Sequence, residues 1–140
     1  MTAPTVGGSA LVWGSGTYRW LLGETTLGEL SAPVAMHTER RLLGLAIGGD
    51  HGCGLLADTT GTVGCWGANY VRQLGADLPQ PEWASPLLVV DSVVNVVLVA
   101  TGYGFSQARL RDASPLDWAS WPGDWNRRCH DVPTELPALR

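Results

Sequence analysis

The sequence predicts an all-β protein, and three observations support this prediction. Gly and Pro are frequent, with 18 and 9 among 140 residues, which is typical of short strands joined by tight turns. Aromatic usage is unusual, because seven Trp stand against one Phe and three Tyr. No segment shows sustained apolar spacing of about 3.6 residues between helix caps. The composition and the spacing therefore argue against a helical bundle.

A segment of about 53 residues recurs along the chain. Residues 8–15 align with residues 61–68, so that Trp66 follows Trp13 by 53 residues, and Trp118 follows at nearly the same interval. The third copy is poorly preserved. We therefore divide one incomplete domain into three copies, which span about residues 1–45, 46–99 and 100–140.

Each copy is expected to contain about four short strands. Residues 42–47 are consistent with a strand, although a short helix is an alternative there. Residues 52–56 and 62–66 flank a loop at 57–61 that has the composition of a hairpin turn. Residues 93–100 are rich in β-branched side chains and predict a buried strand. Recurring groups of four short strands are typical of propeller blades, so we predict a partial β-propeller of about two to three four-stranded blades.

The second copy contains three motifs in order: H-G-C-G-L at 51–55, G-T-V-G-C-W-G-A-N at 61–69 and Q-L-G at 73–75. Together they resemble one repeat of the regulator of chromosome condensation family, whose members usually close seven blades into a ring. The form with two Cys in one repeat resembles the bacterial branch of that family. The resemblance implies structural roles for the residues at the repeat positions. These are Trp13, Gly14, His51, Cys53, Gly61, Cys65, Trp66, Gly67, Asn69, Gln73, Leu74 and Gly75.

The chain departs from the family pattern at several positions. Arg72 occupies a position where the family has Gly, and where we expect a positive φ. Trp20 in the first copy replaces the Gln that stands at position 73 in the second, and the third copy lacks the C-W-G-x-N string. Because 140 residues hold fewer than three periods, we expect an incomplete ring.

Two cysteines are predicted to lie opposite each other. If Leu56 faces Thr62 across the five-residue turn, antiparallel pairing places Cys53 directly opposite Cys65 on one face. Opposed residues of this kind are close enough for a disulfide in an oxidising compartment, whereas two buried thiols are the alternative in the cytosol. The N-terminus shows no signal peptide, so the location is cytoplasmic by default, and secreted or periplasmic if the pair is oxidised. Cys129 has no partner in this pattern.

Charge and residue spacing argue against several classes of function. The net charge of −4 does not favour nucleic acid as a partner, and the most apolar stretch, 87–100, contains too many polar residues to span a membrane. Cys129 and His130 are the only adjacent pair of zinc-type ligands, so we expect neither a metal site nor a cofactor. No spacing supports a nucleophile and its base, and we therefore expect no enzyme activity.

A protein-binding surface remains as the leading hypothesis. Tyr70, Arg72 and Trp83 belong to the residue types that dominate protein interfaces, although packing under its own loop is the favoured alternative for Trp83. The alternatives are guanine nucleotide exchange on a small GTPase, as the family's eukaryotic namesake performs for Ran, inhibition of an enzyme, and a fragment without activity of its own. The partner is not identified by the sequence. Open strand edges also predict self-association or completion by another chain.

Overall fold

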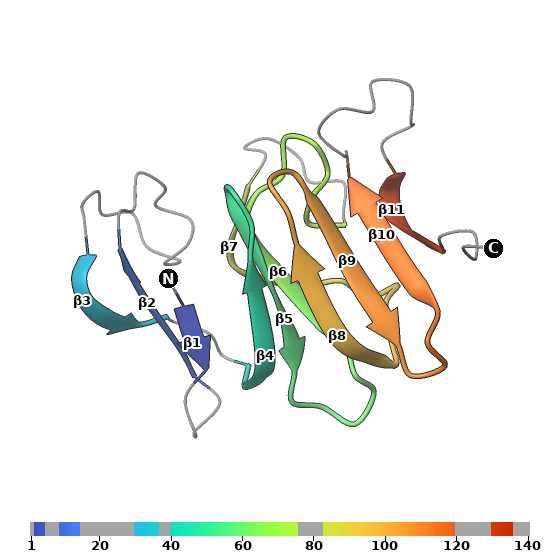
Figure 1. The fold of residues 1–140 in the computed structure, drawn as a ribbon, viewed down its shortest axis with the longest axis horizontal. Helices are drawn as coiled ribbons and strands as arrows, with labels where there is room; N and C mark the ends of the chain where they lie inside the picture. The colour runs from blue at the N-terminus through green and yellow to red at the C-terminus, as the bar shows by residue number, and fades with distance from the viewer. Residues whose placement is uncertain are drawn as a thin grey trace.

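The computed structural model describes residues 2–4, 9–14, 30–36, 40–75, 83–119 and 130–135. The regular elements of these residues are strands, and they form three antiparallel sheets (Figure 1). The first sheet contains β1 (Thr2–Pro4), β2 (Ala10–Gly14) and β3 (Leu30–Ala35). The second contains β4 (Leu42–Ile47), β5 (His51–Leu56), β6 (Val63–Ala68) and β7 (Trp83–Val89). The third contains β8 (Val96–Thr101), β9 (Phe105–Leu110), β10 (Pro115–Ala119) and β11 (His130–Glu135).

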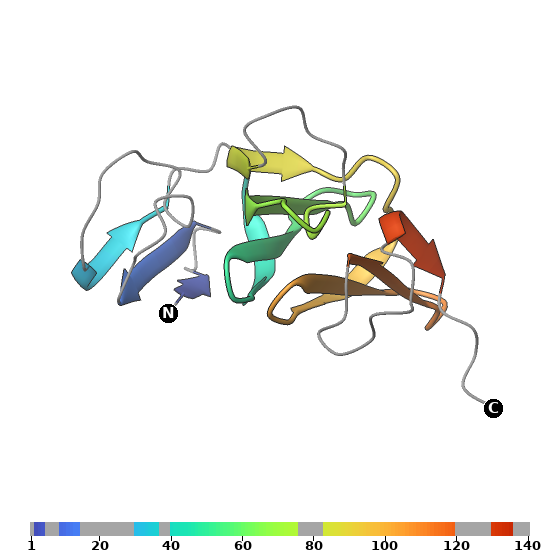
Figure 2. The ribbon, with the colours of Figure 1, turned by 90° about the horizontal axis from the view of Figure 1, so that it is seen from above.

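The three sheets lie side by side in chain order, as blades of a propeller do (Figure 2). The prediction of an all-β chain built as two to three blades is thus confirmed. Over its described part the chain contains no helix able to cross a membrane. The second and third sheets begin at Leu42 and Val96, a few residues before the second and third sequence copies. The boundary between two sequence copies can be placed at any position within the repeat, whereas a sheet begins at the first residue of its first paired strand. The two sets of boundaries therefore differ by a few residues.

Two apolar clusters fill the spaces between neighbouring sheets. Because successive side chains of a strand point to opposite faces, the second sheet contributes to both clusters. One lies between the first and second sheets and consists of Ala10, Val12, Met36, Leu42, Leu56 and Trp66. The other lies between the second and third sheets and consists of Cys53, Val63, Cys65, Leu74, Val90, Val93, Val96, Ala108, Leu116 and Trp118. Each blade therefore shields its neighbour from water.

The β5–β6 hairpin has the register that the five-residue turn predicts. Leu55 lies opposite Val63, and Cys53 lies opposite Cys65 with 4.1 Å between their Cα atoms. The two cysteines form a disulfide, and both are fully buried. The pairing therefore fastens the two central strands of the second sheet to each other.

The turn of this hairpin is organised by one carboxylate. Asp58 Oδ1 accepts hydrogen bonds from the backbone N–H groups of Thr60 and Thr62, at 3.1 and 3.2 Å, and the Thr62 hydroxyl donates to Asp58 Oδ2. These bonds favour the charged form, and the one from the Thr62 side chain contributes most to lowering the pKa of Asp58 to about 2. Gly61 follows with a φ of 64°, which only Gly adopts without steric cost.

The prediction of a buried strand over residues 93–100 was wrong in two respects. The strand begins at Val96, because Asn95 has a φ of 61° and ends the preceding turn. Its side chains are also not uniformly buried, since Val97 and Leu98 are 43% and 57% exposed. The pairing with β9 skips one residue between Val96 and Leu98, and β8 is one of the two edge strands of its sheet. Apolar composition alone does not distinguish such an edge strand from a central one.

Candidate protein-binding surface

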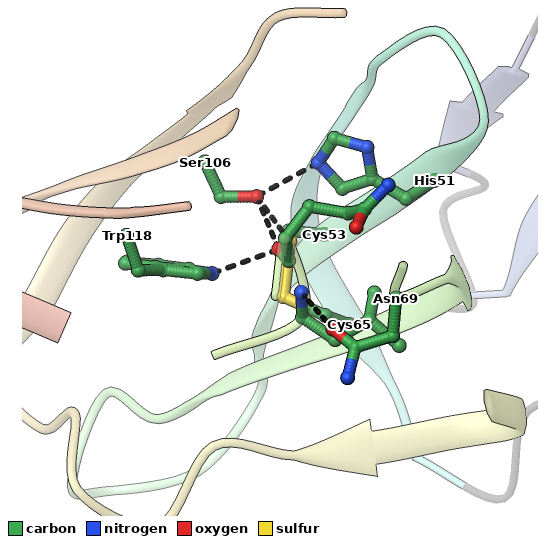
Figure 3. The surroundings of a disulfide bond; sticks show 8 residues. His51, Cys53, Cys65, Asn69, Ser106 and Trp118 are labelled. Atoms are coloured by element: carbon green, nitrogen blue, oxygen red, sulfur yellow. Dashed lines mark hydrogen bonds between the residues drawn. A yellow bond between two sulfur atoms is a disulfide. The ribbon is translucent and has the colours of Figure 1, made fainter. Parts of the chain in front are cut away.

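A hydrogen-bonded network joins the second sheet to the third (Figure 3). The Ser106 hydroxyl on β9 donates to the Gln73 carbonyl at 2.7 Å, and the Trp118 indole N–H on β10 donates to the same oxygen at 2.9 Å. His51 Nε2 on β5 lies 2.8 Å from Ser106 Oγ. Buried polar groups that bond to one another across a blade interface fix the relative position of the blades.

The network determines the state of the His51 ring. Since the single hydroxyl proton of Ser106 goes to the Gln73 carbonyl, His51 Nε2 must be the donor in its contact with Ser106 Oγ. Burial lowers the pKa of His51 to about 4, against a smaller opposite effect of the Phe105 backbone. His51 is therefore neutral near pH 7, and its buried ring has a structural role.

The free energy of unfolding is expected to fall between about pH 6.5 and pH 4. In this range His51 takes up a proton in the unfolded chain but not in the folded one, so stability is complete above the unfolded pKa and decreases as the pH falls. One such group changes the free energy of unfolding by up to about 3 kcal/mol over this range. Urea titrations at several pH values would measure the slope.

A His51→Gln variant provides the control for this prediction, because its side chain does not titrate. We expect the variant to be less stable at pH 7 and to show a smaller pH dependence between pH 6.5 and 4. An identical slope in both proteins would contradict the assignment. Asp58 does not affect the comparison, because it is present in both proteins and its carboxyl titrates mainly below pH 4.

The loop that follows β6 is held by hydrogen bonds and carries two predicted binding residues, an exposed Tyr70 and a half-buried Arg72. Asn69 Oδ1 accepts the Leu74 N–H at 2.9 Å, and the Arg72 N–H donates to the Asn69 carbonyl at 3.1 Å. Arg72 has a φ of 66°, as expected from the glycine of the family pattern. Tyr70 is 51% exposed. A residue other than Gly at positive φ stores strain of about 1 kcal/mol or more, which is common at functional sites.

Three turns meet at one end of the second and third sheets, the upper end in Figure 1. The Tyr70 hydroxyl donates to the carboxylate of Asp50, which is only 6% exposed and lies in the β4–β5 turn. The preceding Gly49 lies against the Tyr103 ring of the β8–β9 turn. The approach is so close that a Cβ at Gly49 would be only 2.8 Å from Tyr103 Cδ2. We call Asp50, Tyr70, Arg72 and Tyr103 the tyrosine surface.

Sequence reasoning found only part of this surface. It missed Tyr103, which at 69% has the highest exposure of the large apolar side chains among the described residues, and it missed Asp50. The signal was present, because residues 48–50 align with residues 102–104, and the second of these turns has an aromatic residue between two glycines. Trp83 begins β7, where its backbone lies beside Ala68, and its side chain lies outside the described part of the structure.

The residues at the repeat positions are mostly buried or adopt a positive φ. Full or nearly full burial is shared by His51, Cys53, Cys65, Trp66, Asn69, Gln73 and Leu74. Positive φ is shared by Gly61, Gly67 and Gly75. Trp13 is half-buried in β2, where Gly14 pairs with Leu30. The described residues contain no group of three or more His, Cys, Asp or Glu side chains close enough to hold a metal ion.

Comparison with known proteins supports the fold. No family model and no curated protein matches the sequence. Among solved structures, human WBSCR16 is similar with a TM-score of 0.77 at 19% identity, over 97% of this chain and 35% of that one. Yeast RCC1 (Prp20) bound to Kap60 gives 0.74 at 18%, over 98% and 35%. Prp20p from Saccharomyces cerevisiae gives 0.69 at 17%, over 99% and 34%.

The chain has the fold of an RCC1-like β-propeller segment. It spans about a third of the length of the structures it matches. The structure has three blades side by side, with an apolar core between neighbouring blades. This agrees with a segment of about a third of a propeller.

Proposed function

We propose that this chain is a protein-binding module and that its partner contacts the tyrosine surface. The observation that supports the proposal is the pair of exposed tyrosines on rigid turns: Tyr70 is held by Asp50, and Tyr103 packs on Gly49. Such side chains bury a large area at low entropic cost, because they are already ordered before binding. One of the similar structures contains Kap60 bound to yeast RCC1, and another is described with binding to Gsp1p and histones. Those protein partners support a binding role for this chain.

The proposal assigns no catalytic step, cofactor or metal to the chain. Nucleotide exchange on a small GTPase follows only from the resemblance, because no described residue is matched to an exchange role. Cys53 and Cys65 are compatible with the bacterial type of repeat, and their disulfide is compatible with a secreted or periplasmic protein. If the chain is instead a fragment without activity of its own, no protein is expected to bind through the tyrosine surface.

Replacing Tyr70 and Tyr103 with alanine is expected to abolish partner capture. The wild-type chain and the double variant would be immobilised and exposed to extract from the organism that encodes the gene, and bound proteins would be identified by mass spectrometry. A Leu43→Ala variant is the matched control, since Leu43 is 65% exposed on β4 and lies outside the tyrosine surface. We expect a protein retained by the wild type and the control but not by the double variant.

Binding of the purified partner would then be measured by calorimetry. Loss of two interface tyrosines should weaken the affinity by about thirtyfold or more, as expected for hot-spot residues. Equal retention of all proteins by the double variant would overturn the proposal. Accelerated release of labelled GDP from a captured GTPase would instead establish exchange, and loss of activity of a captured enzyme would establish inhibition.

A further inference from the structure

The outward faces of the second and third sheets, meaning the faces turned away from the preceding sheet, can be compared position by position. Both sheets place two cross-strand pairs at equivalent positions on their second and third strands. These pairs are Cys53–Cys65 and Leu55–Val63 in the second sheet, and Gln107–Asp117 and Arg109–Pro115 in the third.

In the second sheet the outward face is a complete apolar contact surface. Cys53, Val63 and Cys65 are each 0% exposed, and they belong to the same cluster as Ala108 and Trp118 of the third sheet. The third sheet therefore covers this face, as expected for successive blades.

In the third sheet the same positions are polar or exposed. Arg109 and Pro115 are exposed, and Gln107 is half-buried. Asp117 is 5% exposed, and its Oδ1 has no hydrogen-bond partner. Leu98, Ala100 and Pro115 are apolar and exposed on this face, but Gln107, Arg109 and Asp117 lie among them, so the face lacks the continuous apolar surface of the second sheet.

A further blade of the same kind would present apolar side chains to this face. It would then remove the Arg109 guanidinium from water with only the Asp117 carboxylate, diagonally across the β9–β10 pair, to compensate its charge, and the Gln107 amide without a hydrogen-bond partner. Removing a charge from water in this way is strongly unfavourable, and burying an unpaired amide is also costly. In repeat proteins a polar outer face is characteristic of a terminal repeat.

We propose that the outward face of the third sheet is a capping surface, which does not accept a second copy of this chain. Head-to-tail stacking of copies through this face is thereby disfavoured. The expected self-association is then left to other surfaces, which include the first sheet and the edge strands β4, β7, β8 and β11. This inference concerns a face other than the tyrosine surface and does not depend on the proposed function.

The test restores the apolar pattern of the second sheet. We would compare the wild type, an Arg109→Leu variant and a triple variant with Gln107→Val, Arg109→Leu and Asp117→Val. Arg111→Leu is the matched control for Arg109→Leu, because Arg111 is an exposed arginine in the β9–β10 turn and its loss changes the net charge by the same amount; the triple variant leaves the net charge unchanged. Sedimentation velocity over a range of concentrations measures self-association, and circular dichroism verifies folding.

We expect the triple variant to self-associate at least about tenfold more tightly than the wild type. The Arg109→Leu variant should show a smaller increase, and Arg111→Leu should show none. The proposal is overturned if Arg109→Leu and the triple variant behave as Arg111→Leu does, or if either associates less than the wild type. Should the triple variant not fold, the exposed Arg109→Leu substitution decides the question alone. Association through another surface shifts all variants alike, so the differences between them are decisive.

Discussion

Replacing Trp118 with alanine is expected to lower the free energy of unfolding by about 4 kcal/mol. Trp118 is fully buried in the cluster between the second and third sheets, and its indole N–H donates to the Gln73 carbonyl. Truncation leaves a cavity at this interface and removes a side-chain hydrogen bond that joins the loop after β6 to the third sheet. The total free energy of unfolding of a domain is only about 5 to 15 kcal/mol, so the variant should have a much lower melting temperature than the wild type.

Two further variants separate the causes of this loss. Trp118→Phe keeps most of the buried ring and removes the donor, while the Gln73 carbonyl still accepts from Ser106, so we expect a loss of only about 1 to 2 kcal/mol. Tyr103→Ala removes an exposed aromatic residue of the same sheet and should change stability by less than about 0.5 kcal/mol. Urea unfolding measures all three variants. A Trp118→Ala protein as stable as Tyr103→Ala would show that the blade interface is not formed as described.

Gly67→Ala is expected to destabilise the protein by about 3 kcal/mol or more, since strain and steric conflict add. Gly67 has a φ of 102°, and a Cβ there would lie 2.6 Å from the Asp50 carbonyl oxygen and 2.8 Å from His51 Cα. Both contacts are with backbone atoms, which cannot rotate away as the end of a side chain can. The close approach also allows the Ala68 N–H to donate to the Asp50 carbonyl at 2.8 Å.

Gly44→Ala is the matched control in the same sheet. A Cβ at Gly44 would have no atom within 4 Å, and we expect a change of less than about 0.5 kcal/mol. Thermal and urea unfolding of the two variants test the difference, and equal stability would contradict it. Because Asp50 holds Tyr70, Gly67→Ala should also weaken partner binding at temperatures where the variant is folded.

The hairpin of the second sheet was predictable because its determinants are local. Five turn residues between two runs of strand-forming residues fix the pairing of Cys53 with Cys65, and the structure has that register. The positive φ at Arg72 was also predictable, since it follows from a glycine position in the repeat pattern. Residues close in sequence restrict one another's dihedral angles whatever the rest of the chain does.

Other features depend on residues that are distant in sequence. Ser106 follows His51 by 55 residues, and no spacing rule connects the two. Tyr103 and Gly49 likewise meet only because the second and third sheets pack side by side. The exposure of Val97 and Leu98 could not be predicted from apolar composition, because it depends on which edge of the sheet is left open.

By itself the sequence determined that the chain is all-β, that a four-stranded unit recurs along it, and that two cysteines face each other. These properties arise from turn residues and from the period-2 alternation of strands, which act over a few residues. The packing of one blade on the next alone decided that His51 is neutral, that two tyrosines share a surface, and that the two outward sheet faces differ in polarity. Burial, hydrogen bonding and pKa depend on surrounding atoms, and only the folded chain brings those atoms together.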